Sequence, residues 1–340
     1  MQPEPLISIV IVYWNSATYL PRCLDCISQQ TFRDFEIIII DNGSLDEGTK
    51  GVEQIYPELH LRLERLSANR GFAAANNLAA RLARGKWLVL LNADAFPNAD
   101  WLEKLIEATK VYPDVVSFSS RQLQSNNPNI LDGAGDAYHV SGFAWRLGLG
   151  YPADRYGLKT AELFSPCAAA AMYRREAFIE AGGFDEDFFS YYEDVDLGFR
   201  LQLQNHPSMY IPQAVVQHVG SATFGVRSDF AFYYSHRNLI WTFVQNMPSA
   251  LLWRYLPAHF LANLIYVIYY TLRGRGKVLW KAKWDALRGL PKALKKRQKI
   301  QKTKRVSNTD LLCVMERGVL KPYLLGYHLR RVLAESAKEN

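Results

Sequence analysis

Short apolar runs alternate with helical patterns along the first hundred residues. Runs of β-branched and other apolar residues predict buried strands, whereas apolar residues at helical spacing predict helices. Strands that alternate with helices through short connections imply a mostly parallel, Rossmann-like sheet with helices on both faces. Ligands bind such a sheet at the carboxyl ends of its strands. We therefore expect an α/β fold with strands at 6–12, 35–40, 61–66 and 87–91, and helices at 16–30 and 72–83.

Polar residues follow three of these strands directly. Asp41-Asn42-Gly43-Ser44 ends the second, Asn69-Arg70-Gly71 follows the third, and Asn92-Ala93-Asp94 follows the fourth. A carboxylate at this edge of the sheet can hold a hard cation and, with it, a diphosphate. Asp94 alone does not establish such a site, because an aspartate after a strand is as often a helix cap or a turn former.

A second cluster, between Gly182 and Arg200, interleaves acids with aromatic residues and runs into an amphipathic helix pattern. Bulky aromatic neighbours partly desolvate a carboxylate, which raises its pKa and suits it to act as a general base. The structural alternative is that Glu193 and Asp194 open the helix, where the helix dipole favours acids.

His218 comes after the apolar run 214–216, so another short strand delivers a polar side chain to its end. A lone histidine is usually structural. Here an acid after a strand, an acid-aromatic cluster and a histidine after a strand follow each other in the order expected of one composite site. We therefore predict that Asp94, the acid-aromatic cluster and His218 form one composite site.

The positive charge of the chain is concentrated toward its C-terminus. Of the 40 Lys and Arg residues, 14 lie between Arg273 and Arg305, where Asp285 is the only acid, and the rest of the chain is mildly acidic. Trp280 and Trp284 are four residues apart on one helical face among these cations, a pattern typical of an interfacial helix on anionic lipid. The alternative is a solvated basic face.

The apolar segment 254–272 precedes this basic stretch. It is barely long enough to cross a bilayer, and Pro257, His259 and Asn263 interrupt it. We therefore expect membrane contact to be peripheral, with a transmembrane helix as the less favoured alternative.

The first residues lack the pattern of a secretory signal, because the apolar run at 6–12 is short and follows Glu4 instead of a basic stretch. The cysteines are too few and too scattered for a disulfide framework, which favours a reducing compartment. They are Cys23, Cys26, Cys167 and Cys313. These features predict a cytoplasmic protein, peripheral at the inner face of the cytoplasmic membrane.

In combination, the motifs between about 7 and 247 resemble glycosyltransferase family 2, whose members are inverting enzymes of the GT-A fold. Within it, the chain looks most like bacterial rhamnosyltransferases of cell-envelope polysaccharide synthesis. The motifs that carry the resemblance are Val12-Tyr13-Trp14-Asn15, Asp41-Asn42-Gly43-Ser44, Asn69-Arg70-Gly71-Phe72-Ala73-Ala74-Ala75-Asn76-Asn77, Leu91-Asn92-Ala93-Asp94, Gly182-Gly183-Phe184-Asp185, Glu193-Asp194-Val195-Asp196 and His218.

The resemblance implies a binding site for a nucleotide-diphosphate sugar. In it, Asp41 hydrogen-bonds the pyrimidine ring, and Trp14 contacts the base from a position where tyrosine is more usual. Asn69 and Arg70 lie along the nucleotide. Asp94 matches the last acid of the family's D-x-D element and would hold a metal ion on the diphosphate.

The resemblance also implies the reacting groups. His218 matches a histidine that supplies a further metal contact in some members, and Asp194 matches the catalytic base. Asp94, Asp194 and His218 are therefore predicted to converge around one pyrophosphate and cation. Tyr192 and Glu193 are candidates on the acceptor side. Asn92 replaces the first acid of D-x-D, so we expect Mg²⁺ or Mn²⁺ to be held mainly by the remaining acid, the histidine and the donor's own phosphates.

On this basis residues 1–247 are expected to form a GT-A domain, and residues 248–340 a helical, basic, membrane-associating extension. The chain is predicted to be an inverting hexosyltransferase that moves a sugar, with dTDP-rhamnose as the favoured donor, to a hydroxyl of a glycan or lipid-linked acceptor. The alternatives are a UDP-sugar donor and a non-catalytic relative that binds sugar nucleotides. Specificity would depend on 122–163 and 188–192, and the oligomeric state stays open.

Two other classes of protein are disfavoured. A nucleic-acid-binding protein would explain the basic segment but not the acids around Asp194, and no recognition motif is present. A nicotinamide-dependent oxidoreductase would explain the alternating strands, but Trp14-Asn15-Ser16 follows the first strand where a G-x-G-x-x-G is needed.

Overall fold

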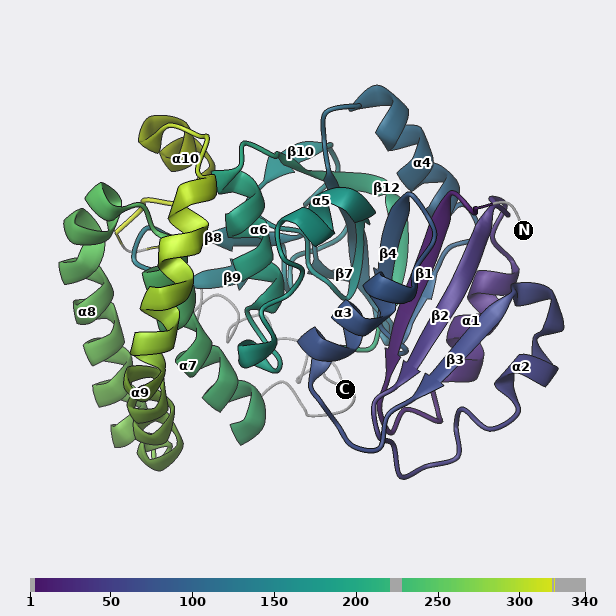
Figure 1. The fold of residues 1–340 in the computed structure, drawn as a ribbon, viewed down its shortest axis with the longest axis horizontal. Helices are drawn as coiled ribbons and strands as arrows, with labels where there is room; N and C mark the ends of the chain where they lie inside the picture. Colours follow the sequence, from purple (N-terminus) through teal and green to yellow (C-terminus); the bar gives the residue numbers. More distant parts are fainter. Residues whose placement is uncertain (1–3, 221–227, 320, 322–340) are drawn as a thin grey trace.

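A mixed β-sheet forms the centre of the fold (Figure 1). The computed structural model describes residues 4–220, 228–319 and 321. Over these residues the sheet has ten strands, in the order β10-β12-β6-β11-β4-β1-β2-β3, with β5 paired to β12 and β7 paired to β6. The strands are β1 (Ile7–Tyr13), β2 (Phe35–Asp41), β3 (Leu61–Arg65), β4 (Trp87–Leu91), β5 (Ala95–Pro97), β6 (Ser117–Gln124), β7 (Asn127–Gly133), β10 (Ala161–Leu163), β11 (Ala170–Arg174) and β12 (Ser208–His218). A separate hairpin pairs β8 (Asp136–Tyr138) with β9 (Ala144–Arg146).

The four strands predicted from apolar runs are confirmed as β1 to β4, and they pair in parallel. β1, β2 and β4 are buried almost throughout, which explains their near-continuous apolar sequences. β11 then runs antiparallel to both β4 and β6, whereas β12 lies parallel to β6. β12 ends at His218, as the sequence indicated.

Helices cover both faces of the sheet, as predicted. On one face, α1 (Leu20–Ser28) and α4 (Trp101–Val111) share a core with Ile9 of β1. On the other, α3 (Phe72–Leu82), α5 (Arg175–Glu180) and α6 (Glu193–Leu203) share a core with Val10. Shorter turns of helix are α2 (Val52–Ile55), η1 (Pro57–Leu59), η2 (Glu186–Phe188) and η3 (Gln301–Thr303).

The first helix begins at Leu20, later than the pattern predicted. The Ser16 hydroxyl donates to the Trp14 carbonyl at 3.0 Å and so does not cap the helix. Pro21 lies in the first turn, where the N–H that it lacks has no helical partner.

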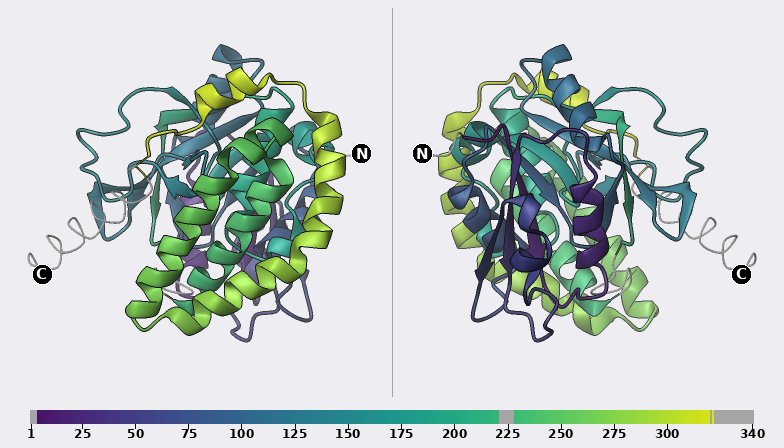
Figure 2. Two further views of the ribbon diagram at one scale, coloured as in Figure 1. Left: turned by 90° about the vertical axis from the view of Figure 1, so that its left-hand side faces the viewer. Right: turned by 90° about the vertical axis from the view of Figure 1, so that its right-hand side faces the viewer.

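Three long helices form a further layer at the end of the molecule opposite β3 (Figures 1 and 2). They are α7 (Asp229–Asn246), α8 (Ser249–Leu272) and α9 (Gly276–Ile300), and α10 (Asn308–Val314) follows. Phe199 of α6, Phe243 of α7 and Leu251 of α8 are buried in one core, so this layer packs directly on the sheet domain. The domain boundary predicted at residue 247 falls in the turn between α7 and α8, and the division into two domains stays a prediction.

Candidate active site

Asp94 and His218 lie against each other at the edge of the sheet. β5 pairs with β12 so that Ala95 stands opposite His218, which brings the preceding residue, Asp94, beside the imidazole. Asp94 Oδ1 is 3.3 Å from His218 Nε2, and the Asp94 carbonyl accepts a hydrogen bond from Val219 N at 3.0 Å. Two residues that are far apart in the sequence thus meet as predicted.

The pair has the spacing and chemistry to hold a hard divalent cation. Two neighbouring ligands of one octahedral ion, with bonds of about 2.1 Å, stand roughly 3 Å apart, close to the separation of Asp94 Oδ1 and His218 Nε2. Asn92 Nδ2 lies 3.4 Å from the same nitrogen. Carboxylate oxygens such as those of Asp94 are ligands that Mg²⁺ and Mn²⁺ accept.

Asp132 and Arg146 orient His218, and the sequence reasoning missed both. Asp132 Oδ2 lies 2.8 Å from His218 Nδ1 and accepts from Arg146 Nη1 at 2.9 Å. A carboxylate behind a histidine fixes the ring and its tautomer, an arrangement common for metal-binding histidines. Both residues lie on strands within 122–163, Asp132 on β7 and Arg146 on β9, and an acid after an apolar pair was the only sequence signal there.

The surroundings of His218 favour its protonated form. Burial lowers the pKa of the imidazole, but hydrogen bonds to Asp132 and Asp94 outweigh burial and raise the pKa to about 9. At neutral pH the imidazole is therefore a cation between two carboxylates, and a metal ion at Nε2 competes with a proton.

Asp132→Asn should weaken Mn²⁺ binding by about 10–100-fold, because it removes the charged acceptor that orients His218. Calorimetric titration of the protein with Mn²⁺ measures the effect. Asp154→Asn is the matched control, since Asp154 lies in the same region with its side chain 76% exposed beside Arg155. An unchanged dissociation constant for Asp132→Asn would contradict the orienting role.

Asp194 lies in the first turn of α6, and backbone contacts hold its carboxylate. Ala168 N donates to Asp194 Oδ2 at 3.1 Å. The next residue, Ala169, accepts from Asn92 N at 2.9 Å through its carbonyl. The segment before β11 therefore ties Asp194 to the turn that carries Asp94.

Asp136 and Arg146 connect Asp194 to the histidine. The ligand atoms of Asp136, Cys167 and Asp194 all lie within 4.8 Å of one another. Burial and the charge of Asp194 raise the pKa of Asp136 to about 7. Arg146, which pairs with Asp132, interacts electrostatically with both other acids. A continuous network of charges thus joins the three residues that were predicted to converge.

The group of Asp136, Cys167 and Asp194 is poorly suited to the same cation. Burial raises the pKa of the Cys167 thiol to about 12, so the sulfur carries a proton. Hard cations also prefer oxygen ligands. Burial raises the pKa of Asp194 as well, against the opposing effects of Ala168 N–H and the charge of Arg146. A carboxylate of raised pKa is suited to accept a proton.

Asp41 ends β2 with both carboxylate oxygens engaged. Ser44 N donates to Oδ1 at 3.0 Å, and Thr49 Oγ1 donates to Oδ2 at 2.7 Å. These bonds fix the carboxylate and leave further lone pairs for a ligand. Tyr13 stands opposite Asp41 in the pairing of β1 with β2, so Trp14 follows at the neighbouring strand end.

Asn42 ties the turns after β2 and β3 together. Its Nδ2 donates to Asn69 Oδ1 at 3.0 Å, and its Oδ1 accepts from Arg70 N at 2.9 Å. Gly43 has a φ of 74°, and a Cβ there would lie 2.5 Å from the carbonyl carbon of Ala68, so the turns approach this closely only because the residue is glycine. Asn69 and Arg70 therefore lie beside the turn that follows Asp41.

A strained loop leads into α6. Phe189, Tyr191 and Tyr192 have φ values of 66°, 67° and 70°, which L side chains rarely adopt. The fully buried Asn238 of α7 holds this loop, because its Nδ2 lies 2.7 to 3.0 Å from three of the loop's carbonyl oxygens. Strain of this kind clusters at functional sites, where the surrounding structure maintains it.

Tyr192 and Glu193, the acceptor-side candidates, are half-buried and buried, respectively. The Tyr192 hydroxyl accepts from Ala144 N at 3.0 Å. Glu193 Oε2 has no hydrogen-bond partner among the described residues, and burial together with the charge of Asp194 raises its pKa. Their role toward an acceptor stays a prediction.

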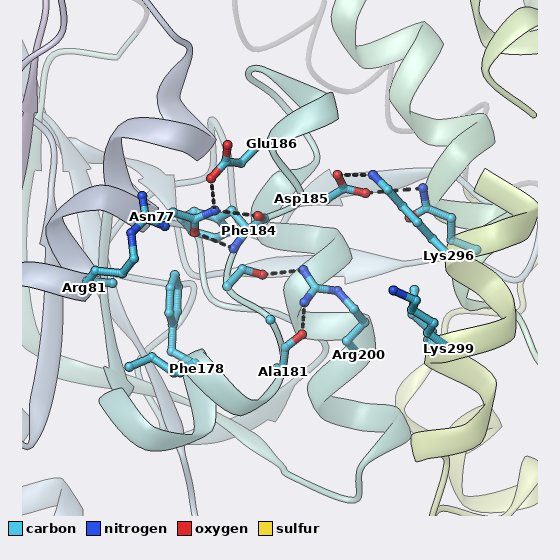
Figure 3. A pocket seen from close by; sticks show the side chains of 16 residues that line it. Asn77, Arg81, Phe178, Ala181, Phe184, Asp185, Glu186, Arg200, Lys296 and Lys299 are labelled. Carbon is cyan, nitrogen blue, oxygen red and sulfur yellow. Dashed lines mark hydrogen bonds and ion pairs between the residues drawn. The ribbon is translucent and has the colours of Figure 1, made fainter. Parts of the chain in front are cut away.

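The Gly182-Gly183-Phe184-Asp185 motif has a structural role (Figure 3). Asn77 exchanges two hydrogen bonds of 2.8 Å with the backbone of Phe184, and Arg200 Nη2 donates to Gly183 O at 2.7 Å. Lys296 of α9 forms an ion pair with Asp185. These residues line an open cleft of about 540 Å³ that no predicted site residue lines. The motif therefore anchors the start of the strained loop.

Comparison with known families adds to this geometry. A family model described as Glycosyl transferase family 2 matches residues 8–182, just over half of the chain. The chain belongs to glycosyl transferase family 2. The match includes Asp41, Asn69, Arg70 and Asp94 of this family 2 enzyme, whereas Asp194 and His218 lie beyond it.

Relatives of this family 2 glycosyltransferase agree with the predicted family and fold. An N-acetylglucosaminyl-diphospho-decaprenol L-rhamnosyltransferase of Mycobacterium tuberculosis is 28% identical over 240 residues, which cover 63% of this chain and 76% of the relative. GalNAc-T7, crystallised with UDP, GalNAc and Mn²⁺, has a TM-score of 0.58 at 18% identity and is matched over 49% of its length by 73% of this chain. S. aureus TarS 1-349 in complex with UDP-GlcNAc has a TM-score of 0.51 at 19% identity, and the match covers 75% of this chain and 72% of the TarS chain. The enzyme has the GT-A fold.

Proposed function

We propose that this enzyme moves a sugar from a nucleotide-diphosphate donor to a hydroxyl of a glycan or lipid-linked acceptor, with inversion at the anomeric carbon. The observation that carries the proposal is the contact of Asp94 with His218, together with the hydrogen bonds that tie Asp194, through Ala168 and Ala169, to the turn that carries Asp94. A cation site and a carboxylate of raised pKa are the two groups that a single displacement on a diphosphate sugar needs.

Asp94 and His218 would hold Mg²⁺ or Mn²⁺ beside the diphosphate. A bound cation neutralises the negative charge that develops on the leaving group. Asp132 keeps Nε2 of the imidazole turned toward Asp94. GalNAc-T7, a neighbour with the same fold, was crystallised with Mn²⁺, which supports a divalent ion here.

Asp194 is the proposed general base. Its carboxylate takes the proton of the acceptor hydroxyl while that oxygen bonds to the anomeric carbon and the bond from this carbon to the diphosphate oxygen breaks. The hydrogen bond from Ala168 N holds Oδ2 in place, and burial favours proton uptake. One displacement inverts the configuration.

The favoured donor is dTDP-rhamnose, and the favoured acceptor is lipid-linked in cell-envelope polysaccharide synthesis. The name of the Mycobacterium tuberculosis relative states both rhamnosyl transfer and a diphospho-decaprenol compound. Asp41 and Trp14 would contact a pyrimidine base, and Asn69 and Arg70 would lie along the nucleotide. A UDP-sugar offers a pyrimidine too and is the second candidate. The enzyme would act at the inner face of the cytoplasmic membrane.

A donor panel tests this function. The purified protein is incubated with dTDP-rhamnose, UDP-GlcNAc or GDP-mannose, in Mn²⁺ or in EDTA, and nucleotide-diphosphate release and melting temperature are measured. We expect dTDP-rhamnose to raise the melting temperature and to be hydrolysed slowly when Mn²⁺ is present. If UDP-GlcNAc alone were hydrolysed, the favoured donor would be a UDP-sugar instead of dTDP-rhamnose. A raised melting temperature without hydrolysis would indicate a non-catalytic relative that binds sugar nucleotides. No response to any donor would overturn the proposal.

A further inference from the structure

α8 lies on the outside of the helical layer (Figure 2, left). Its outward residues are largely apolar and exposed to solvent. Trp253, Phe260 and Leu272 have exposed fractions of 70%, 68% and 83%. Trp253 and Phe260, seven residues apart, lie at almost the same angle around the helix, and Leu272 lies about a third of a turn away at the end of the helix, roughly 28 Å from Trp253 at 1.5 Å per residue. α8 contains one charged residue, Arg254. The other large apolar residues on this face, each at least 40% exposed, are Leu261, Leu264, Ile265 and Ile268. A contiguous apolar surface of this kind marks contact with a partner.

The opposite face of α8 packs against α7 and α9 and carries polar groups. His259 stacks on Phe243 with ring centroids 4.0 Å apart, and its Nδ1 lies 2.8 Å from Ser141 O. Asn263 Oδ1 accepts from Lys283 Nζ at 2.6 Å. These contacts hold one face of the helix, which carries its four buried residues, against the protein.

This packing disfavours a transmembrane span. Within residues 4–220, 228–319 and 321, α8 is the one helix that is long and apolar enough to cross a bilayer. Crossing would draw its packed partner α9 into the hydrocarbon, and each Lys or Arg of α9 would oppose that transfer. A helix with one packed face and one exposed apolar face lies instead in the plane of the membrane interface.

α9 adds tryptophans and cations to the same layer. Trp280 and Trp284 are 57% and 58% exposed, and Lys281 and Arg288 next to them are exposed. Asp285, the one acid of α9, is hydrogen-bonded to a tyrosine of α7. Tryptophan rings are favoured at the headgroup level of a bilayer, and Lys and Arg attract anionic headgroups.

Three other cations of α9 are engaged inside the protein. Lys292 and Lys296 pair with Asp187 and Asp185, and Lys283 is buried. The outward charge near the turn between α8 and α9 comes from the exposed Arg273 in the turn and from the first half of α9. In Figure 1 this turn lies toward the same side of the molecule as the carboxyl ends of β1 to β3.

We propose that α8 and the first half of α9 form a membrane-docking surface. The apolar face of α8 enters the headgroup boundary of an anionic bilayer, and the tryptophans and exposed cations of α9 contact its headgroups. A second copy of the chain is a poorer partner, because it would set these cations against each other. The inference deepens the proposed function, since it names the surface that would bring the site to a lipid-linked acceptor.

Flotation of the full chain with vesicles tests this surface. Wild type should float with phosphatidylcholine vesicles that contain phosphatidylglycerol. Phe260→Glu/Ile268→Glu should reduce this binding at least ~10-fold, because two charges would have to enter an apolar boundary. Ile55→Glu/Val111→Glu is the matched control, since both of these apolar residues are 66% exposed elsewhere on the surface, and it should float like wild type.

Charge and competing partners are tested in the same assay. Lys281→Glu/Arg288→Glu should weaken binding to anionic vesicles and leave any binding to neutral vesicles unchanged. Flotation of Phe260→Glu/Ile268→Glu at the wild-type level would overturn the proposal. The proposal would also be overturned if the wild-type chain were dimeric and did not float with vesicles, and if Phe260→Glu/Ile268→Glu were monomeric.

Donor hydrolysis without lipid separates the two proposals. It should be unchanged in all of these variants, because none of the altered residues belongs to the candidate active site. A wild-type chain that floats as expected but hydrolyses no donor would overturn the proposed function and support the docking surface. A chain that hydrolyses donor but does not float would support the proposed function and overturn the docking surface.

Discussion

Asp194→Asn is expected to slow glycosyl transfer by about 10²–10⁴-fold while donor binding is retained, because the amide cannot accept the proton of the acceptor hydroxyl. An asparagine side chain has the same shape, and its oxygen can still accept from Ala168 N, so the fold should be unchanged. Steady-state transfer kinetics measure the loss, and calorimetry with the nucleotide diphosphate checks donor binding.

A control with the same helix position tests whether this effect is specific. Glu176 lies in the first turn of α5, just as Asp194 lies in the first turn of α6, but Glu176 is exposed. Glu176→Gln therefore removes an acid from an equivalent place in the helix dipole. It should leave transfer unchanged.

Wild-type activity should fall as the pH decreases, with a midpoint above the usual carboxyl range, because burial raises the pKa of a base that must be ionised. A wild-type rate in Asp194→Asn would contradict the assignment.

Asp94→Asn is expected to lower Mn²⁺-dependent transfer on the order of 10²-fold or more. A metal ion at a leaving group supplies several kcal/mol of charge stabilisation, and about 1.4 kcal/mol corresponds to a factor of ten in rate. Unlike Asp194→Asn, this change should also weaken binding of Mn²⁺ and of the donor. Transfer rates at increasing Mn²⁺, with calorimetry for binding, separate the two variants.

The control for this change is Asp114→Asn, at an exposed acid before β6. It should match wild type in both assays. If Asp94→Asn bound Mn²⁺ with the wild-type affinity, the proposed metal contact would be wrong, even if transfer were slower.

The parallel half of the sheet could be predicted because its strands are buried on both faces and therefore appear as uninterrupted apolar runs. Asp41 and Asp94 could be predicted for the same reason, since each ends or follows such a strand, whereas His218 was indicated by the short apolar run 214–216 near the end of β12. The order of the motifs along the chain predicted that Asp94 and His218 would meet. It did not predict the antiparallel pairing of β5 with β12 that brings them together.

Asp132 and Arg146 could not be predicted from local pattern. They lie on the short strands β7 and β9, and β7 pairs with β6 through two register shifts, so no period marks which of its side chains faces the site. Their importance comes from a contact with His218, which is distant in the sequence. The same is true of Asn238, whose buried amide gives no sign in the sequence that it holds the loop before α6.

The ion pairs of Lys292 and Lys296 with Asp187 and Asp185 have a practical consequence for work with this enzyme. A recombinant fragment that ended at Met247 would lose both cations, so the two acids would repel each other beside the loop that leads to the proposed base. It would also uncover Phe243 and its neighbours, and bare aromatic surface promotes aggregation. Expression is therefore better attempted with the C-terminal helices retained and with a mild detergent or lipid nanodiscs in the buffer.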